Sequence, residues 1–202
     1  MTFFANSKYK FLPIGEDGAI ETEPFLNAAA EVIPFFDVLG STAFSPVKSD
    51  ISGNISKLRK KYEENREAHH TLQMIVDREI EAKTTKVSNS ATDALLWLKR
   101  ALEFILVFLQ KVIEGEQDLT KAANAAYAAS LKRYHGWIVS GIFSLAMKAV
   151  PYREDFIKAL AKGASEDQVM ADMAEFMGVF EPNVRTIGEF YKAKGVDSDA
   201  TV

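Results

Sequence analysis

The sequence predicts an all-α protein, and three observations carry this prediction. Strand-like alternation of apolar and polar residues is scarce, and no Asn-Gly or Asp-Gly turn joins two apolar runs. Signals for helix starts recur instead, at Ser45-Pro46, at Ser90-Ala91-Thr92-Asp93 and at Ser165 to Gln168. Pro151 follows a segment of helical character that ends near residue 150.

We expect about eight helices in one domain that spans residues 1–202. Residues 1–20 are expected to be an N-terminal extension that is partly loop. The second helix begins with Ser45 as N-cap and Pro46 at its first position, while Ser90 and Ser165 begin two later helices. Pro182 is expected to break or bend the last helix. In chain order, the expected helices cover residues 22–37, 46–65, 67–83, 91–114, 118–130, 131–149, 152–161 and 166–194.

Length and composition fit one soluble globular domain. The chain has 202 residues, of which 48% are hydrophobic and 26% charged, and this usage argues against a disordered chain or a coiled coil. It has no cysteine, which excludes a disulfide framework, a thiolate zinc site and a cysteine nucleophile. The net charge of −4 disfavours nucleic-acid binding through overall charge. No secretory signal is recognised, and charges interrupt the apolar run 94–113, so we expect a cytoplasmic protein without a membrane span.

Two stripes run side by side along the segment 46–65. At helical spacing, a polar stripe of acidic, amide and basic groups lies directly beside an apolar one. A solvated helix edge explains such a pattern, and so does a hydrogen-bonding array for a polyhydroxyl group such as a sugar. The polar stripe contains Asp50, Asn54, Lys57 and Lys61, and the apolar stripe contains Val47, Ile51, Ile55, Leu58 and Tyr62.

The segment 131–149 divides into two faces if it is one helix. His135 falls on an apolar face with Ile138 and Ile142, where a histidine is either a core residue or a ligand contact. Trp137 falls on a polar face with Arg133 and Lys148. An exposed tryptophan beside cations suits a membrane–water interface, although a protein contact or an isolated surface residue explains it equally well.

At these residues the sequence resembles the glycolipid transfer protein family. The similarity rests on PFFDVLGSTAFSPVKSDISGNISKLRKKY (34–62), ALLWLKRALEFILVFLQ (94–110), LKRYHGWIVSGIF (131–143) and VPYREDF (150–156). The resemblance implies an all-α two-layer helical sandwich that encloses one lipid. It also implies transfer of glucosyl-, galactosyl- and lactosylceramide between membranes, without catalysis, metal or cofactor.

The resemblance also implies roles for individual residues. Asp50 and Asn54 bond sugar hydroxyls, Lys57 reaches the headgroup, Trp97 stacks under the first sugar, and His135 bonds the ceramide amide. Membrane docking falls on Trp137, with Arg133 and Lys148 beside it. The apolar chamber for the ceramide is expected to involve Phe35, Phe36, Phe44, Val47, Leu102, Phe104, Phe108, Phe143, Phe156 and Phe176.

Two departures from the family pattern concern the edges of the expected site. The chain ends VDSDATV, where some members place a tyrosine against the headgroup, so that contact is missing or is supplied by the terminal backbone near Val202. Lys148 replaces an aromatic residue late in the docking helix of some members.

Several alternatives stay open. Ceramide-1-phosphate transfer ranks second, because Asn54 and Trp97 are neutral where phosphate would need cations. A glycolipid sensor that signals to a protein partner shares the same site residues. A glycosidase ranks low, because it needs two carboxyl groups and only Asp50 is placed at the site. Phe35-Phe36 also resembles motifs that bind endoplasmic-reticulum receptor proteins, and burial of both rings would make that motif unavailable. We expect a monomer that touches membranes peripherally.

Overall fold

The structure, a computed structural model, describes residues 1–40 and 42–202, and this part of the chain is helical. Its only β-type contact is an isolated antiparallel bridge between Glu21 and Thr71. The described elements are α1 (Thr22–Val32), α2 (Phe35–Gly40), α3 (Ser45–Glu64), α4 (Leu72–Glu81), α5 (Ala91–Ile113), α6 (Leu119–Ser130), the 3₁₀ helix η1 (Lys132–Tyr134), α7 (Trp137–Met147), α8 (Arg153–Ala161) and α9 (Glu166–Lys194).

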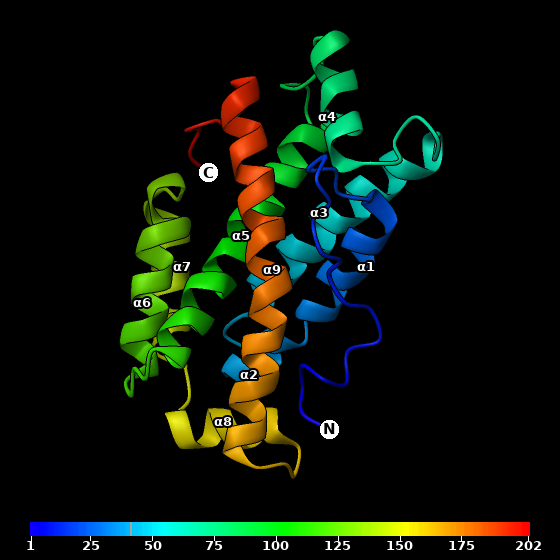
Figure 1. The fold of residues 1–202 in the computed structure, drawn as a ribbon. Helices are drawn as coiled ribbons and strands as arrows, with labels where there is room; N and C mark the ends of the chain where they lie inside the picture. The colour runs from blue at the N-terminus through cyan, green and yellow to red at the C-terminus, as the bar shows by residue number, and fades with distance from the viewer. Residues whose placement is uncertain (41) are drawn as a thin grey trace.

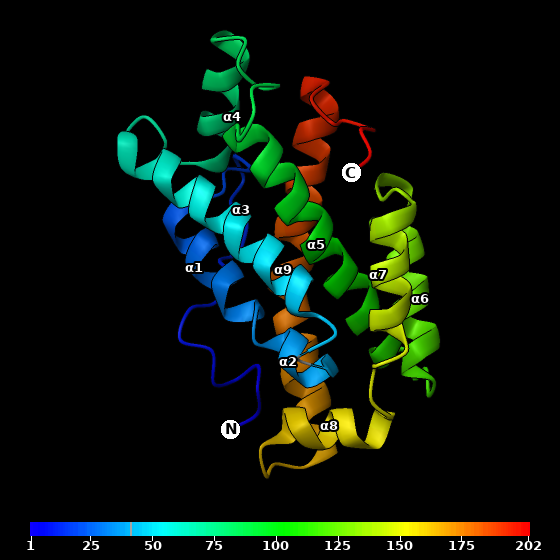
Figure 2. The ribbon, with the colours of Figure 1, turned by 180° about the vertical axis from the view of Figure 1, so that it is seen from behind.

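Two layers of helices pack face to face. In Figure 1, α1, α9 and α6 lie in front of α3, α5 and α7, and the view from behind in Figure 2 reverses this order. The long helix α5 runs through the middle and packs against α3, α6 and α9. The short helix α8 lies at one end, against α2 and α9, and α4 lies at the other end. The expected all-α two-layer sandwich is confirmed.

Side-chain caps explain where several helices begin. Ser90 accepts from the Asp93 backbone N–H at the start of α5, and Ser165 accepts from the Gln168 N–H at the start of α9, as the sequence predicts. The prediction that Ser45 caps α3 is wrong. Phe44 occupies the N-cap, and Ser45 is already the first helical residue.

The predicted helix 22–37 is two helices, because Pro34 interrupts it. Proline has no backbone N–H, so the continuous i→i−4 ladder fails there. The chain turns more tightly instead, with i→i−3 bonds from Ile33 to the Ala30 carbonyl and from Phe36 to the Ile33 carbonyl. This break turns α2 away from α1 and directs both of its phenylalanines into the core, where they are 1% and 0% exposed.

Backbone pairing between distant segments shortens two further predicted helices. The helix predicted at 67–83 begins at Leu72, because the backbone around residues 70–72 pairs with the backbone around residues 20–22. The helix predicted at 131–149 is interrupted before Trp137. There the Gly136 N–H donates to the Val202 carbonyl over 2.7 Å, and the Val202 N–H donates to the Tyr134 carbonyl over 2.9 Å. Residues 135–136 are therefore extended.

Pro182 lies inside α9 and does not end it. The neighbouring Asn183 is buried, and its side-chain amide donates to the carbonyls of Val179 and Leu12 at 2.8 Å each. These bonds and the burial of Phe180 and Val184 on either side hold the turn in place. No helix among the described residues is long and apolar enough to cross a membrane.

Candidate functional site

Asp50, Asn54 and Lys57 lie on successive turns of α3, as their spacing predicts. The Asn54 side chain is buried, and its amide nitrogen donates to the Asp50 carboxylate over 3.2 Å. Asp50 lies at the surface, but partial burial of its carboxyl group raises the pKa of Asp50, and Lys57 and the Asn54 bond oppose this increase. The array presents an acceptor, an amide and an ammonium group within two turns of helix.

Asp93 is a fourth polar residue at this site, and the sequence analysis did not single it out. Its negative charge is the smallest of the contributions that raise the pKa of Asp50, although the two residues belong to different helices, α3 and α5. Asp93 is exposed on the first turn of α5, four residues before Trp97, and therefore shares a face with it. That four-residue spacing was the available signal.

Trp97 and His135 stack beside each other. Their rings are nearly parallel, at 13°, with centroids 6.0 Å apart. Trp97 is half-buried, so part of its indole stays open to a ligand. The sequence interpretation that His135 lies on the apolar face of a helix is wrong, because His135 lies in the extended backbone just before α7.

Tyr127 and Phe143 hold the His135 ring in place. The Tyr127 hydroxyl lies 3.1 Å from Nδ1 of His135, and the Phe143 ring lies 4.8 Å from the imidazole, centroid to centroid. Partial burial, together with the charge of Arg100, lowers the pKa of His135 and keeps the ring neutral at pH 7. Because Nδ1 is engaged by Tyr127, Nε2 is the nitrogen left for a ligand.

Arg100 supports the two stacked rings from behind. Its guanidinium is 1% exposed and lies 3.3 Å from the Tyr134 ring centroid and 4.9 Å from that of Trp97. It also pairs with Asp197 at 3.2 Å and donates to the Ser198 carbonyl. The C-terminal residues 197–202 are thereby held next to the extended segment that carries His135, where the Val202 backbone pairs on both sides of the histidine.

The residues predicted for the ceramide chamber lie in the core, but they fill it. Phe36 lies 5.7 Å from Phe44 and 6.4 Å from Phe104, centroid to centroid. Phe35, Phe108 and Phe156 form a triangle of edge contacts at 5.6–6.0 Å between centroids. Leu102 is fully buried and Val47 is 6% exposed. An alkyl chain can therefore occupy this region only if the aromatic side chains separate.

Two of the predicted chamber residues lie apart from this cluster. Phe143 packs on Tyr127 and on His135, with ring centroids 4.8 Å away in both cases. Phe176 is half-buried and contacts Phe4 and Phe180, beneath the N-terminal residues.

An exposed apolar surface covers α7 and the loop after it. Trp137 is 85% exposed, as predicted, and Arg133 and Lys148 are exposed close to it in the chain. The prediction that Ile138 and Ile142 face the core is wrong, because the helix begins later and turns both outward. We define the α7 surface as Trp137, Ile138, Ile142, Leu145 and Tyr152, all of which are exposed.

The predicted receptor motif at Phe35-Phe36 is not available for binding. Both rings are buried in α2, so no partner can reach them without unfolding that helix.

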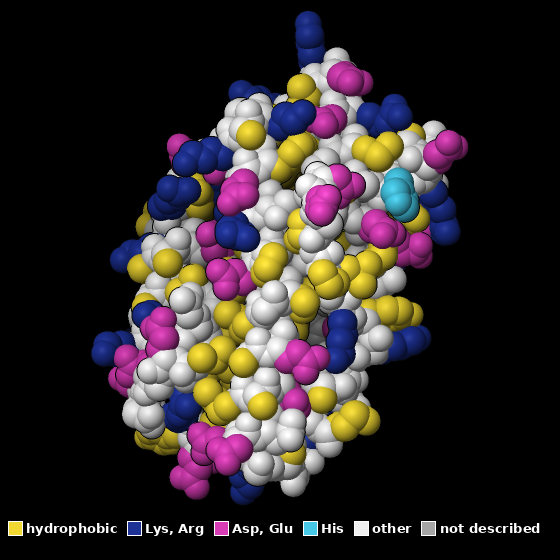
Figure 3. All heavy atoms as spheres, in the orientation of Figure 1, with side chains coloured by type: hydrophobic (Ala, Val, Ile, Leu, Met, Phe, Trp, Pro, Cys, Tyr) yellow, Lys and Arg dark blue, Asp and Glu magenta, His cyan; other side chains and the backbone are white. Residues whose placement is uncertain are grey.

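On the face of the molecule seen in Figure 3, charged side chains of both signs are spread along the edges, and apolar side chains gather in the middle, around α9.

A family model and curated relatives match this chain. The model described as Glycolipid transfer protein (GLTP) matches residues 20–162. Pleckstrin homology domain-containing family A member 8 of Homo sapiens is 41% identical over 210 residues, which cover 100% of this chain and 40% of that protein. Putative protein PLEKHA9 of Homo sapiens is 48% identical over 161 residues, which cover 79% of this chain and 41% of that protein. The chain thus spans about two fifths of the length of these relatives.

Solved structures share the fold over nearly the whole chain. The structure that addresses how FAPP2 selects simple glycosphingolipids with the GLTP fold is 40% identical, with a TM-score of 0.91 and 100% coverage of both chains. HET-C2, a fungal glycolipid transfer protein, is 37% identical, with a TM-score of 0.88 and coverage of 98% of this chain and 100% of that one. The human ceramide-1-phosphate transfer protein shares the fold at 19% identity, with a TM-score of 0.83 and coverage of 98% and 95%. This chain belongs to the glycolipid transfer protein family.

Proposed function

We propose that residues 1–202 act as one domain that carries simple glycosphingolipids, namely glucosyl-, galactosyl- and lactosylceramide, between membranes. The observation that carries the proposal is the pairing of a hydrogen-bonding array with an aromatic platform. Asp50 and Asn54 on α3 supply the array, and the half-buried Trp97 on α5, stacked on His135, supplies the platform. The hydroxyl groups of a sugar pair with hydrogen-bonding side chains, and the flat apolar face of its ring stacks on an aromatic side chain.

Each group has a defined part in this proposal. The carboxylate of Asp50 and the amide of Asn54 bind sugar hydroxyls, and Lys57 donates to a further oxygen of the headgroup. Trp97 stacks against the first sugar ring. Nε2 of His135 bonds the ceramide amide, which joins the polar headgroup to the two chains.

The aromatic core takes the chains by opening. A ceramide has roughly 30 methylenes, and their exposure to water would cost on the order of 24 kcal/mol, so unassisted exchange between membranes is very slow. A carrier with an apolar interior removes most of this cost. Because the chains supply little discrimination, selectivity comes from the headgroup bonds, each contributing about 0.5–1.5 kcal/mol and up to about 3 when charge-assisted. Transfer of a lipid between membranes in this way requires neither catalysis nor a cofactor, and one monomer is enough to carry one lipid.

The α7 surface docks the carrier on the membrane in this proposal. Trp137 supplies an amphipathic ring for the interface, and Arg133 and Lys148 attract anionic lipids, at about 1 kcal/mol each. His135 directly precedes α7, so docking brings the headgroup site to the bilayer. This arrangement fits a cytoplasmic protein in peripheral contact with membranes.

A ceramide-1-phosphate carrier is the less favoured alternative. The phosphate would meet two carboxylates, Asp50 and Asp93, with Lys57 as the nearby cation on α3. The human ceramide-1-phosphate carrier shares only the fold with this chain, at 19% identity.

Vesicle-to-vesicle transfer tests the proposal. Galactosylceramide, lactosylceramide, sulfatide and ceramide-1-phosphate are measured in parallel, together with release of free sugar as a control for glycosidase activity. Wild type is expected to move the two neutral glycolipids, and Trp97→Ala and Asp50→Val to abolish their transfer while far-UV circular dichroism stays unchanged. Trp97→Phe keeps a flat ring and is expected to retain part of the activity. Unchanged transfer by both disabling variants contradicts the proposal.

A further inference from the structure

A partly open, mainly apolar cavity of about 130 Å³ lies beneath the N-terminal segment, defined here as residues 2–12. The segment has no helix, and it supplies one wall of the cavity, while α1, α5 and α9 supply the others. An apolar cavity of about 150 Å³ stays dry and holds a benzene-sized molecule, so this one has room for about six carbon atoms. The residues that matter below are Phe4, Phe11, Ala28, Ile105 and Phe176.

A continuous row of aromatic side chains joins this cavity to the start of α3, the helix that carries Asp50 and Asn54. It begins at Phe44, one residue before α3. Successive ring centroids in the row are 5.1–6.2 Å apart, which is contact distance for aromatic pairs. The order of the rings is Phe44, Phe36, Phe35, Phe3, Phe4 and Phe176.

The distance from the headgroup site fits the length of a lipid chain. Ile105 lines the cavity and lies eight residues after Trp97 on α5, which is about 12 Å along the helix axis. One leaflet of a bilayer is about 15 Å of hydrocarbon, half of the usual core thickness. A chain that starts at the headgroup site and follows the aromatic row therefore ends near this cavity.

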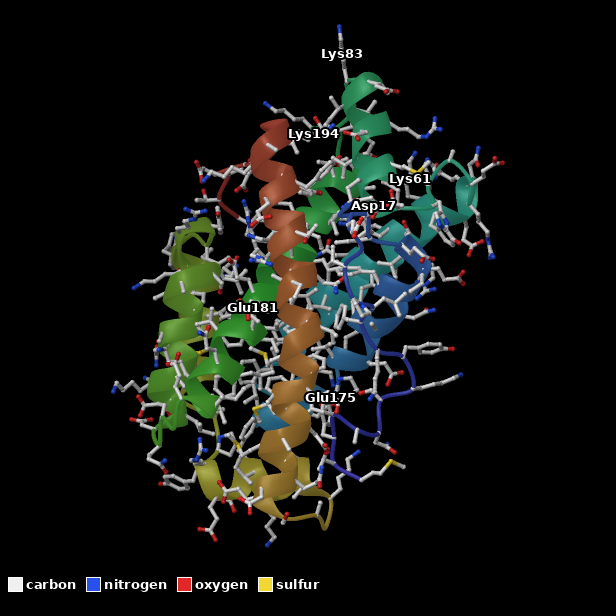
Figure 4. All side chains as sticks on the ribbon, viewed as in Figure 1. Asp17, Lys61, Lys83, Glu175, Glu181 and Lys194 are labelled. Carbon is white, nitrogen blue, oxygen red and sulfur yellow. The ribbon has the colours of Figure 1, made fainter. Side chains whose placement is uncertain are left out.

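The N-terminal segment is anchored at both ends, and the polar contacts of its middle part are exposed. Thr2 donates to Asp172 over 2.5 Å, and the Leu12 carbonyl accepts from Asn183 over 2.8 Å, so both ends are fixed to α9. The middle is held by exposed contacts, such as the ion pair between Lys10 and Glu175 at 3.7 Å. Glu175 lies beside the N-terminal segment in Figure 4. Exposed pairs of this kind contribute little, so the segment is held mainly by its two anchors and by the buried rings of Phe4 and Phe11.

We propose that this cavity receives the terminal carbons of the acyl chain and that the N-terminal segment sets the preferred acyl-chain length. Phe4 and Phe11 line the cavity from the N-terminal segment, and Phe176 lines it from α9. This inference rests on the proposed function, and it assigns to residues 2–12 a part in lipid selection that the headgroup residues do not have.

Filling the cavity tests the proposal by transfer measurements. Ala28→Leu adds a larger side chain to the cavity wall, and Ala29→Leu is the matched control, because Ala29 is equally buried but does not line the cavity. Transfer of galactosylceramide with an 18-carbon acyl chain is compared with that of an 8-carbon analogue. Ala28→Leu is expected to lower the ratio of 18-carbon to 8-carbon transfer about tenfold, which is roughly the worth of two methylenes. An unchanged ratio, or an equal change in the control, overturns the proposal.

A labelling experiment on the wild type does not depend on how the variants fold. Galactosylceramide with a photoreactive diazirine at the last acyl carbon is loaded from vesicles and irradiated. Labelling is expected on residues 2–12 and on α9 near Phe176, and labelling confined to other segments overturns the inference. If the wild type transfers no galactosylceramide of either length, the proposed function itself fails, whereas transfer with label elsewhere rejects only the role of the N-terminal segment.

Discussion

At Asp50, the proposed role in headgroup binding is combined with a cost to the fold. Partial burial raises the pKa of its carboxyl group, so the folded protein holds the charged form less favourably than the unfolded chain does. For an acid with a raised pKa, the stability of the fold improves as the pH falls through that pKa and worsens above it. At neutral pH the negative charge of Asp50 therefore lowers the stability of the fold. Such a cost is expected for a residue that binds a ligand.

The substitution Asp50→Asn tests this opposition between binding and stability. It removes the partly buried charge but keeps the shape, so the midpoint of urea unfolding at pH 7 is expected to rise. Transfer of galactosylceramide is expected to fall at least tenfold, because charge-assisted bonds to sugar hydroxyls are lost. A fall in both quantities would show that the carboxylate supports the fold rather than the ligand.

The same pKa direction predicts how transfer depends on pH. As the pH falls, Asp50 takes up its proton at a higher pH than an ordinary aspartate, so headgroup binding weakens before the fold is affected. Transfer by wild type is expected to decline toward acid pH while near-UV circular dichroism stays constant. The Asp50→Asn variant is expected to show a flatter profile over the same range, and an identical decline in both proteins would contradict this assignment.

Asp93 offers a test of headgroup charge selection. Its carboxylate interacts with Asp50, so an anionic headgroup meets two negative charges there. Asp93→Asn is expected to raise transfer of sulfatide relative to galactosylceramide by severalfold. Asp167→Asn, which removes an exposed aspartate on α9, controls for the change in net charge. An equal effect of both variants would mean that overall charge, not the site, determines selectivity.

At the scale of elements, α4 fixes the start of the helix that carries Trp97. Glu79 on α4 is 7% exposed, and its carboxylate accepts from the Ala91 N–H, the Thr92 N–H and the Thr92 hydroxyl at 2.7–2.9 Å. These are orphan donors at the N-terminus of α5, where a negative charge also suits the helix dipole. One buried side chain thus joins two helices and orients the platform of the headgroup site.

Glu79→Ala is expected to lower the free energy of unfolding by about 2–3 kcal/mol, because buried donors lose a charged partner. Chemical denaturation measures this change, and Glu81→Ala, on an exposed position of the same helix, is the control with little expected effect. A loss below about 0.5 kcal/mol, the usual size of a surface substitution's effect, would show that α5 does not need this cap.

Local signals predicted most helices, and distant backbone pairing explains two of the errors, at residues 67–71 and 135–136. Ser90 and Ser165 act as caps, because capping depends on a few neighbouring residues. The interruption before Trp137 depends on backbone bonds to Val202, which helical periodicity in residues 131–149 cannot reveal. The spacing of Asp50, Asn54 and Lys57 was readable within one helix. The support from Arg100, and the electrostatic effect of Asp93 on Asp50, depend on the packing of separate elements.

At the scale of the whole molecule, the proposed function requires that the α7 surface meets the membrane and that the filled core opens there. The exposed Trp137 and Leu145 are expected to enter the interface, and Trp137→Ala is expected to weaken sedimentation with phosphatidylserine-containing vesicles about tenfold. Leu12→Ala, at an exposed position on the N-terminal segment, is the control. Equal binding of the vesicles by the wild type, Trp137→Ala and Leu12→Ala would show that α7 does not dock on the membrane.

The central claim is that the chain binds one simple glycosphingolipid and recognises its sugar through Asp50, Asn54, Trp97 and His135. Native mass spectrometry after incubation with mixed vesicles of galactosylceramide and ceramide-1-phosphate tests it directly. We expect one galactosylceramide per protein chain in the wild type and none in a protein with both Asp50→Val and Trp97→Ala. A wild-type protein that emerges without lipid, or that carries mainly ceramide-1-phosphate, would contradict the account.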